Sequence, residues 1–205
     1  MQAATPFVSF GGVKVPLPPG AFLQAVEACE RDMASWVLDA LTEVRAANEP
    51  VCDLFAGLGA FTFPVSRVAP VSSYEENAEA IRAVAKAAGE AKGLKPVSAT
   101  RRDLFRAPLG SAELNKFACI IADPPRQGAQ AQCHALASSQ IRAVIMLSCN
   151  PATFARDASI LLNGGLQLAQ LAAFDQFRFT AHVEIAALFV RPAKRKGGPS
   201  SALKQ

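Results

Sequence analysis

Short apolar runs recur along the central part of the chain, and helical segments or turns separate most of them. The segments Asn77–Ala88 and Gln130–Ser138 are two such separating stretches. Continuous apolar strands interleaved with helices are typical of a parallel sheet that is covered on both faces. The pattern therefore predicts an α/β fold with a Rossmann-like, doubly wound sheet. Its first five predicted strands are Val51–Phe55, Val71–Tyr74, Val97–Thr100, Ala118–Ala122 and Ala143–Leu147.

The N-terminal part begins with an extended segment, Phe7–Val15, and prolines and a glycine then mark a turn that ends at Gly20. A long amphipathic helix is predicted from Ala21 to about Ala46, because apolar residues recur there at close to helical spacing. The residues expected to face the core are Phe22, Val26, Cys29, Met33, Trp36, Val37, Ala40 and Leu41.

Two more apolar segments, Leu166–Phe174 and Val183–Val190, are predicted to be the last strands. A short loop joins them, which favours an antiparallel hairpin at the edge of the sheet. The sheet would then have about seven strands, with the last one antiparallel. We expect residues 1–20 to be an extended N-terminal segment, residues 21–192 to form the single domain, and residues 193–205 to be a flexible basic tail.

The composition fits one ordinary globular domain, with 205 residues, 51% hydrophobic and 19% charged. No apolar run approaches the roughly 20 residues that a membrane span requires, and Met1–Phe10 does not resemble a secretory signal. These features predict a cytoplasmic monomer without membrane contact. The five scattered cysteines form no CxxC pair and only two histidines occur, which argues against disulfides and against a metal site. A net charge of +4 permits contact with a polyanion, although the excess lies largely in the tail.

A glycine-containing loop, Asp53–Gly59, closes the first of the central strands. Glycines let the backbone approach a ligand closely, but a bare GxG is a weak signal and a ligand-free turn is an alternative. Glu75 ends the next strand, where an acidic residue can accept hydrogen bonds from ribose hydroxyls. Asp103 follows the third strand, where its carboxylate could meet an adenine amino group. These residues leave both a nicotinamide dinucleotide and S-adenosylmethionine open as the cofactor.

The loops after the fourth and fifth strands carry the candidate chemistry. The fourth is followed by Asp123-Pro124-Pro125-Arg126, in which the prolines stiffen the loop. The fifth is followed by Cys149 and then Asn150-Pro151, a good N-cap followed by a good first helical residue. Because a helix N-terminus favours a thiolate, the position predicts a reactive Cys149. A buried, inert cysteine is the alternative.

Glu184 opens the last predicted strand and lies among apolar residues. A carboxylate in such surroundings can have a raised pKa and act as a base. Alternatively, Glu184 is simply exposed on an edge strand, and periodicity does not decide between the two.

Three motifs together resemble the RNA uracil-5-methyltransferase family, which makes 5-methyluridine in tRNA and rRNA. They are Asp123-Pro124-Pro125-Arg126 with Gly128, Ser148-Cys149-Asn150-Pro151, and the segment from Asp175 through Phe177, Thr180 and His182 to Glu184. The resemblance runs from about Phe7 to Arg191. It implies a class I methyltransferase fold, S-adenosylmethionine as cofactor, RNA as substrate, and a chain that represents the catalytic domain only.

The resemblance also implies residue roles. Cys149 matches the family's nucleophile and Glu184 matches its proton acceptor. The cofactor contacts that it implies are Gln24, Phe55, Glu75, Asp103 and Asp123.

Two other hypotheses compete with this one. Cytosine methylation also uses a cysteine thiolate, but its enzymes commonly carry a Pro-Cys motif, whereas Ser148 precedes Cys149 here. Alternatively, the chain is a truncated domain that binds the cofactor but has little independent activity, because the family's N-terminal RNA-binding barrel does not occur in this sequence.

Overall fold

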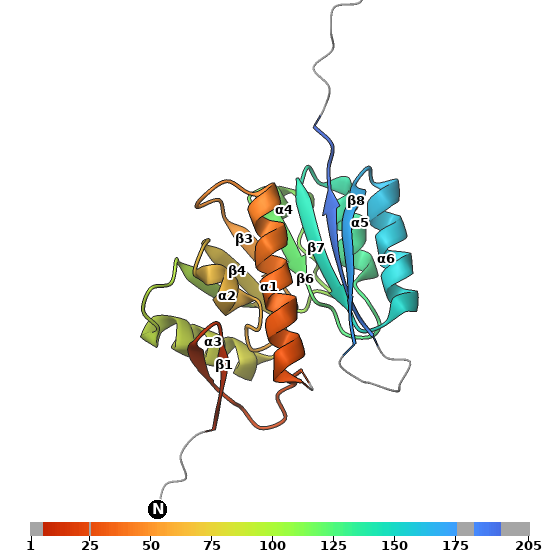
Figure 1. Cartoon of the computed structure of the whole chain (residues 1–205). Helices are drawn as coiled ribbons and strands as arrows, with labels where there is room; N and C mark the ends of the chain where they lie inside the picture. Colours follow the sequence, from red (N-terminus) through yellow and green to blue (C-terminus); the bar gives the residue numbers. More distant parts are fainter. Residues whose placement is uncertain (1–5, 25, 176–182, 194–205) are drawn as a thin grey trace, which may run out of the picture.

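A mixed β-sheet forms the centre of the protein in the computed structural model, which describes residues 6–24, 26–175 and 183–193 (Figure 1). Within those ranges the sheet has seven strands in the order β5-β4-β3-β6-β7-β9-β8. The strands β3 to β7 pair in parallel, and β9 is antiparallel to both β7 and β8. The predicted doubly wound α/β fold with an antiparallel last strand is therefore confirmed. The strands are β3 (Val51–Leu54), β4 (Val71–Glu75), β5 (Val97–Arg101), β6 (Cys119–Ala122), β7 (Ala143–Ser148), β8 (Gln167–Phe174) and β9 (Glu184–Val190).

The final hairpin differs from the prediction in one respect. β8 and β9 pair in antiparallel fashion as expected, but β9 lies between β7 and β8, so that β8 alone forms this edge of the sheet. Glu184, the first residue of β9, is therefore on an internal strand and is only 6% exposed. The alternative that Glu184 is exposed on an edge strand is wrong.

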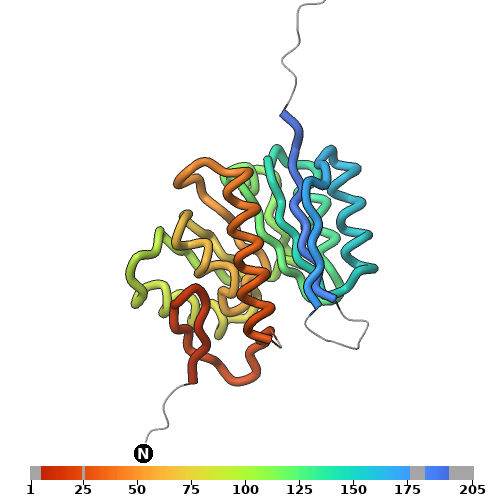
Figure 2. The backbone as a smooth tube through the Cα atoms, viewed as in Figure 1, coloured from red at the N-terminus to blue at the C-terminus, as the bar shows by residue number. Residues whose placement is uncertain are grey.

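Helices cover both faces of the sheet (Figure 2). One face, called here the α1 face, packs against α1 (Glu27–Val44), α2 (Thr62–Ser66) and α3 (Ala78–Glu90). The opposite face packs against α4 (Ser111–Leu114), α5 (Gln130–Ser138) and α6 (Pro151–Asn163). Because both faces are covered, β3, β6 and β7 are buried along their whole lengths, which explains their continuous apolar sequences.

The first long helix is shorter than its apolar periodicity predicts. It begins at Glu27 rather than Ala21 and ends at Val44. Cys29, Met33, Val37, Ala40 and Leu41 are buried as expected, and Trp36 packs partly buried against the same core. Phe22 and Val26, however, are 83% and 39% exposed. The prediction failed because Phe22 and Leu23 continue the apolar pattern but line a cavity instead of the core.

The N-terminal segment is a hairpin rather than a single extended stretch. β1 (Phe7–Phe10) and β2 (Val13–Pro16) pair in antiparallel fashion around a turn at Gly11-Gly12. The buried side chains of Val13 and Val15 pack in one cluster with the apolar face of α3.

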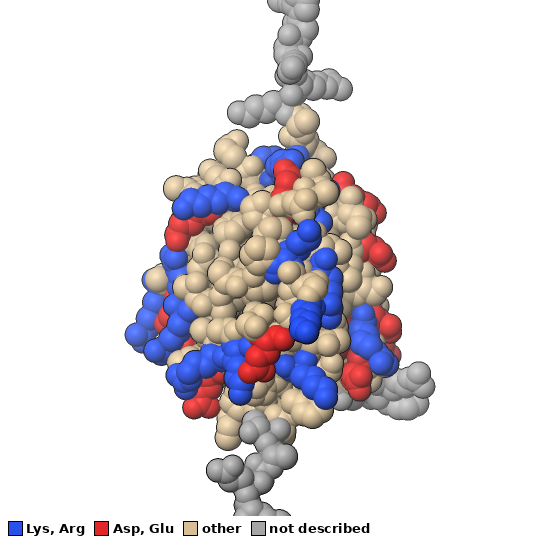
Figure 3. Space-filling model, turned by 90° about the vertical axis from the view of Figure 1, so that its left-hand side faces the viewer, with Lys and Arg blue, Asp and Glu red and all other residues tan. Residues whose placement is uncertain are grey.

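Charged side chains of both signs cover the flank that carries α3 and β5 (Figure 3). Some of them pair within α3, where Arg82 lies 3.5 Å from Glu79 and Lys86 lies 4.0 Å from Glu90. Within the described residues, no helix is both long enough and apolar enough to cross a membrane. The predicted basic tail beyond residue 193 and the motif residues Phe177, Thr180 and His182 lie outside the described residues.

Candidate active site

Polar side chains gather where the strands end on the α1 face. Side chains alternate between the two faces of a strand. Val51 and Val71 pack against α1, and the same alternation assigns Asp53 and Glu75 to that face. Ile121 and Leu147 also pack there, so the residues two positions later, Asp123 and Cys149, follow on the same side. Alternation thus gathers candidate residues from strands that are far apart in the sequence.

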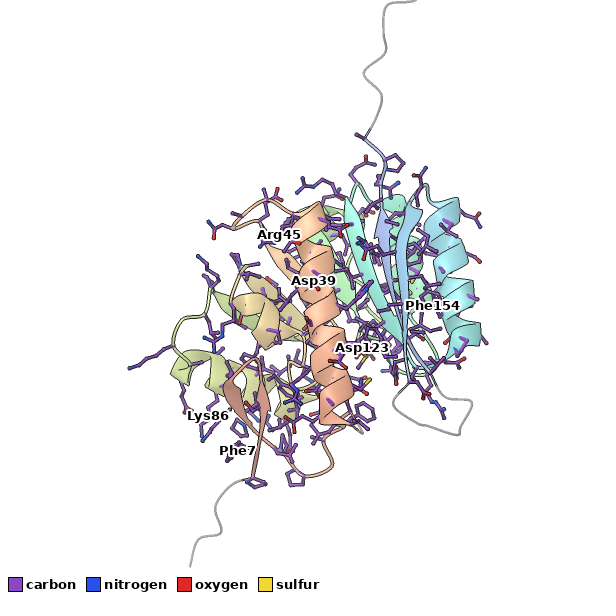
Figure 4. All side chains as sticks on the ribbon, in the orientation of Figure 1. Phe7, Asp39, Arg45, Lys86, Asp123 and Phe154 are labelled. Atoms are coloured by element: carbon purple, nitrogen blue, oxygen red, sulfur yellow. The ribbon has the colours of Figure 1, made fainter. Side chains whose placement is uncertain are left out.

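A cavity of about 740 Å³ opens at this edge of the sheet. Figure 4 shows Asp123 at the lower end of the sheet, where the parallel strands end. This is the edge at which doubly wound folds bind their ligands, and the volume suits a small-molecule site. Of the seven residues predicted for the site, six line the cavity: Gln24, Phe55, Glu75, Asp123, Cys149 and Glu184.

Asp103 is the predicted site residue that does not line the cavity, although its neighbours Arg102 and Leu104 do. Its Oδ1 accepts hydrogen bonds from the amides of Phe105 (2.9 Å) and Arg106 (3.0 Å). Its Oδ2 lies 3.4 Å from Nε of Arg106. The carboxylate thus holds the turn after β5, and the cofactor contact predicted for Asp103 stays a prediction.

The loop after β3 brings its backbone to the cavity wall. Phe55 has a φ of +60°, a conformation that costs energy for a residue with a side chain. Its ring packs against Phe105, with 5.4 Å between the ring centroids. The amide of Gly57 donates a hydrogen bond to Oε2 of Glu75 (3.1 Å), and the amide of Asn77 donates to Oε1 (2.8 Å). These bonds fix the Glu75 carboxylate at the rim, where a ribose could reach it.

Sequence reasoning missed Asp53, which is 1% exposed beneath the glycine loop. Its Oδ2 accepts a hydrogen bond of 2.5 Å from Oγ1 of Thr62. Its Oδ1 has no hydrogen-bond partner within the part of the chain that the structure describes. Burial raises the pKa of Asp53 to about 7, against the opposing effect of the Thr62 hydroxyl. An acidic residue inside the apolar strand Val51–Leu54 was the available signal.

Two more carboxyl groups at the cavity have raised pKa values. Burial raises the pKa of Asp123 to about 7, with further contributions from Glu184 and Asp53. Burial also raises the pKa of Glu30, in the first turns of α1, to about 7, and Glu27 adds to the effect. Sequence reasoning did not single out Glu30.

Cys149 lies immediately before α6, as predicted. Asn150 caps this helix, with Oδ1 accepting a 3.0 Å hydrogen bond from the amide of Ala152, and Pro151 is the first helical residue. The surroundings of the thiol, however, do not lower its pKa in the way that its position before a helix predicts. Burial, followed by the nearby carboxylates Glu184 and Asp123, raises the pKa of the Cys149 thiol. The Arg126 side chain opposes this rise in the pKa without cancelling it.

Arg126 and Glu184 complete the surroundings of the sulfur. β7 and β9 are antiparallel and pair Ser148 with Ile185. Continuing this register places Cys149, one residue after Ser148, beside Glu184, one residue before Ile185. Both line the cavity, and Glu184 acts electrostatically on the thiol. The site therefore combines a cysteine, a nearly buried carboxylate and a guanidinium at one end of the cavity.

The charge of the cavity wall suits a ligand that carries positive charge. Among the described residues, five acidic side chains and two arginines line it. The acidic ones are Glu30, Glu75, Glu76, Asp123 and Glu184, and the arginines are Arg102 and Arg126. Burial is the main cause of the raised pKa values of Glu30 and Asp123, and neighbouring carboxylates add to it. A cation here would offset this repulsion between carboxylates.

Comparison with solved structures defines the class of the protein. The tRNA (uracil-54, C5)-methyltransferase of Pyrococcus abyssi, solved in complex with S-adenosyl-L-homocysteine, superposes with a TM-score of 0.75 at 22% identity. The match covers 93% of this chain and 45% of that chain. The fold is thus that of the class I methyltransferases.

The sequence comparisons are more specific. The family described as tRNA (Uracil-5-)-methyltransferase matches residues 16–192, and the chain belongs to this family. An uncharacterized RNA methyltransferase of Mesorhizobium japonicum is 45% identical over 96% of this chain and 47% of its own length. The 23S rRNA (uracil(1939)-C(5))-methyltransferase RlmD of Alteromonas mediterranea is 34% identical over 70% of this chain and 30% of its own length. The chain spans about half the length of the most similar of these relatives.

Proposed function

We propose that this chain is a catalytic domain that methylates carbon 5 of a uridine in RNA, with S-adenosylmethionine as the methyl donor. The observation that carries the proposal is the convergence of Cys149 and Glu184 at one end of the cavity whose other walls offer cofactor contacts. Family membership supports the chemistry, because the relatives' names specify carbon 5 of uracil. Which RNA this chain modifies is left to experiment, since the named relatives act on different RNAs.

The cavity wall fits the proposed cofactor. Glu75, held by Gly57 and Asn77, offers carboxylate oxygens to ribose hydroxyls. The carboxyl groups of Glu30 and Asp123, both with a pKa of about 7, would face the positive charges of the ligand. Phe55 and Gln24 line the same cavity. When bound, S-adenosylmethionine supplies an electrophilic methyl group to carbon 5.

The chain's own residues make carbon 5 reactive. Carbon 5 of uracil is a weak nucleophile, so the Cys149 sulfur first adds to carbon 6 and carbon 5 gains the character of an enolate carbon. After carbon 5 is methylated, Glu184 accepts the proton from that carbon. The electrons of the broken C–H bond reform the 5,6 double bond and expel the sulfur. The product is 5-methyluracil, Cys149 is regenerated as a thiolate, and the proton is left on Glu184.

Two carboxylates and a guanidinium act on the pKa of Cys149 in opposite directions. The raised pKa of the thiol means that a proton must leave it before attack, and Glu184 and Asp123 are the carboxylates that raise the pKa. The Arg126 side chain lowers the pKa of the thiol and so favours the thiolate. A target base paired within a helix must be extruded from its stack to reach such a site.

A second candidate follows from the length of the relatives. Because this chain covers only 47% of the Mesorhizobium relative, the catalytic domain can bind cofactor and still depend on other protein segments to hold RNA. This candidate predicts cofactor binding without independent methylation.

A covalent trap tests the proposal. The 205-residue chain is incubated with radiolabelled S-adenosylmethionine and RNA that contains 5-fluorouridine, using tRNA and 23S rRNA fragments in parallel. Fluorine cannot leave as a proton, so the reaction should stop with the RNA bonded to Cys149. A labelled band on a denaturing gel that disappears in Cys149→Ala supports the proposal.

The other outcomes separate the alternatives. Absence of a band, despite cofactor binding in equilibrium dialysis, would favour the domain that depends on additional segments. Mass spectrometry of nucleosides from unmodified RNA provides the second readout. Detection of 5-methylcytidine instead of 5-methyluridine would overturn the uracil assignment.

A further inference from the structure

The first two turns of α6 hold the backbone of the loop that follows Asp123. This loop continues as a tight turn, in which the amide of Gly128 donates a 2.8 Å hydrogen bond to the carbonyl of Pro125. The segment from residue 126 to 129, called here the arginine turn, carries the Arg126 side chain to the cavity. Family membership and the proposed chemistry do not explain why this turn and α6 are joined so closely.

Side chains of α6 and of its N-cap residue make hydrogen bonds to three backbone groups of the arginine turn. The carbonyl of Arg126 accepts hydrogen bonds of 3.1 Å from both Nδ2 of Asn150 and Oγ1 of Thr153. The carbonyl of Gln127 accepts one of 2.9 Å from Nη2 of Arg156. These contacts involve backbone atoms of the turn, so they fix its path and not its side chains.

Asp157 anchors the end of the turn. It is 1% exposed, and its Oδ2 accepts a 2.6 Å hydrogen bond from the amide of Ala129. Its Oδ1 accepts a 2.8 Å hydrogen bond from Nε of Arg156, which neutralises the buried charge. A buried carboxylate that is satisfied in this way holds its partners in a defined geometry.

Gly128 shows how closely the turn lies against α6. Its φ is +75°, and a Cβ added there would collide with the side chains of Arg156 and Asp157 and would lie 3.1 Å from Cβ of Thr153. The glycine two residues after Arg126 in the sequence motif is therefore required by contact with α6.

The held turn and the candidate nucleophile meet at the cavity. Arg126 and Cys149 both line the cavity, and the Arg126 side chain lowers the pKa of the Cys149 thiol. Cys149 precedes Asn150, the N-cap of the helix that holds the Arg126 backbone. Asn150 has two functions in this arrangement, because Oδ1 caps α6 while Nδ2 binds the Arg126 carbonyl. The positions of the guanidinium and of the sulfur thus both depend on α6.

We propose that Thr153 and Asp157 are positioning residues, which hold the arginine turn on α6 so that the Arg126 guanidinium stays against the Cys149 sulfur. This inference rests on the proposed function only in taking Cys149 as the nucleophile. The guanidinium then favours the thiolate before attack and again when the sulfur is expelled from carbon 6. Neither Thr153 nor Asp157 lines the cavity, so they act through Arg126.

The test measures thiolate formation at Cys149 and requires neither RNA nor methylation. The rate of Cys149 alkylation by iodoacetamide is followed against pH, with mass spectrometry of the Cys149 peptide. The variants are Thr153→Val, which removes the hydroxyl, Thr153→Ser, which keeps it, and Arg126→Ala, alone and combined with Thr153→Val. Asp157→Asn is a second probe, and thermal unfolding shows which variants remain folded.

We expect Thr153→Val to move the midpoint of the alkylation profile up by about 0.5 pH unit, which slows alkylation about threefold below the midpoint. Thr153→Ser should match the native protein, and Asp157→Asn should shift the midpoint in the same direction as Thr153→Val. In the Arg126→Ala background, Thr153→Val should cause no further shift. An unchanged profile in Thr153→Val, or an equal shift with and without Arg126, would overturn the inference. If the alkylation profiles shift as expected but the native chain does not methylate RNA, the result counts against the proposed function and not against this inference.

Discussion

Cys149 and Glu184 lie beside each other because β7 and β9 are antiparallel and pair Ser148 with Ile185. Cys149 follows the last residue of β7 and Glu184 is the first residue of β9, so both residues lie at the same edge of the sheet. A parallel last strand would have carried Glu184 to the opposite edge. The antiparallel direction of β9 therefore brings the proposed base, Glu184, to the proposed nucleophile, Cys149. The two proposed roles can be tested separately.

Replacing Glu184 should separate attack from release. In Glu184→Gln, Cys149 can still add to carbon 6, but no carboxylate is present to accept the proton from carbon 5. We expect a covalent protein–RNA complex to accumulate with ordinary uridine, together with a loss of turnover of at least about 100-fold. Denaturing gels and single-turnover kinetics measure the two effects. Rapid turnover in Glu184→Gln would assign the proton transfer to another group.

The pH dependence of Cys149 should follow its neighbours. Because burial, Glu184 and Asp123 raise the pKa of the thiol, its alkylation rate should keep rising as the pH increases from neutral to alkaline values. Asp123→Asn removes one negative charge, which lowers the pKa and enlarges the thiolate fraction at a given pH. At pH 8 we expect roughly twofold to threefold faster alkylation than in the native protein.

This second experiment is performed without cofactor, so that effects on cofactor binding do not enter. Asp39→Asn is a matched control, because Asp39 is an exposed residue of α1 that is absent from the cavity wall. Equal rates for native protein and Asp123→Asn would show that the Asp123 carboxylate does not act on the sulfur.

Asp53 should make the stability of the protein depend on pH. Burial raises its pKa in the folded state to about 7 from an ordinary value of 3.8. Between these values the folded state keeps the proton while the unfolded state has lost it. The free energy of unfolding should therefore be highest at low pH within this window, should fall as the pH rises, and should level off above about pH 7.

Asp53→Asn removes this titration and should flatten the pH dependence of stability. One such group contributes a slope of at most about 1.4 kcal/mol per pH unit. The asparagine can still accept the hydrogen bond from Thr62. Glu30 and Asp123 titrate in the same range, so part of the slope should remain. Urea unfolding at pH 5, 6, 7 and 8 measures the slope, and an unaltered slope would contradict the burial effect.

Two glycines of the cofactor loop should respond differently to alanine. Both have positive φ, +52° at Gly57 and +90° at Gly59. A Cβ at Gly57 meets no atom within 4 Å, whereas one at Gly59 would lie 2.8 Å from Cε2 of Phe63. Gly57→Ala should cost only about 1 kcal/mol of stability, from the backbone conformation, but its methyl group would stand at the cavity wall and weaken cofactor binding. Gly59→Ala should destabilise the fold more.

Calorimetry of S-adenosylmethionine binding and thermal unfolding measure this pair. If Gly57→Ala binds the cofactor as tightly as the native protein, the glycine loop does not contact it in the proposed way. If Gly59→Ala is as stable as Gly57→Ala, the Phe63 contact is not what excludes a side chain there.

Local sequence was sufficient for much of the fold. The bounds of α5 agree with the predicted helix Gln130–Ser138, and α6 begins at Pro151 and ends at Asn163 as its capping signals indicate. The strands are found within one residue of their predicted ends because their apolar runs are bounded by polar turns. Local signals failed for the start of α1, since an apolar residue such as Phe22 fits the helical periodicity equally well whether it faces the core or lines a cavity.

The sequence predicted which residues belong to the candidate site, but not how each side chain is oriented. Their positions after successive strands placed them at one edge of the sheet, and six of the seven do line one cavity. Asp103 occupied the expected loop, but its side chain turned to the amides of Phe105 and Arg106. A short acidic side chain after a strand can bind its own backbone as readily as a ligand, and the sequence does not decide between them.

The sequence by itself determined the alternation of strands and helices, the helix that starts after Cys149, and the family. These depend on local periodicity, capping and short motifs, which act over a few residues. Only the tertiary structure decided that Asp53 is buried, that Glu184 is on an internal strand, that the pKa of Cys149 is raised rather than lowered, and that Thr153 and Asp157 of α6 hold the arginine turn. The physical reason is that burial and electrostatic interaction depend on distances between segments far apart in the chain, and those distances exist only once the sheet has assembled.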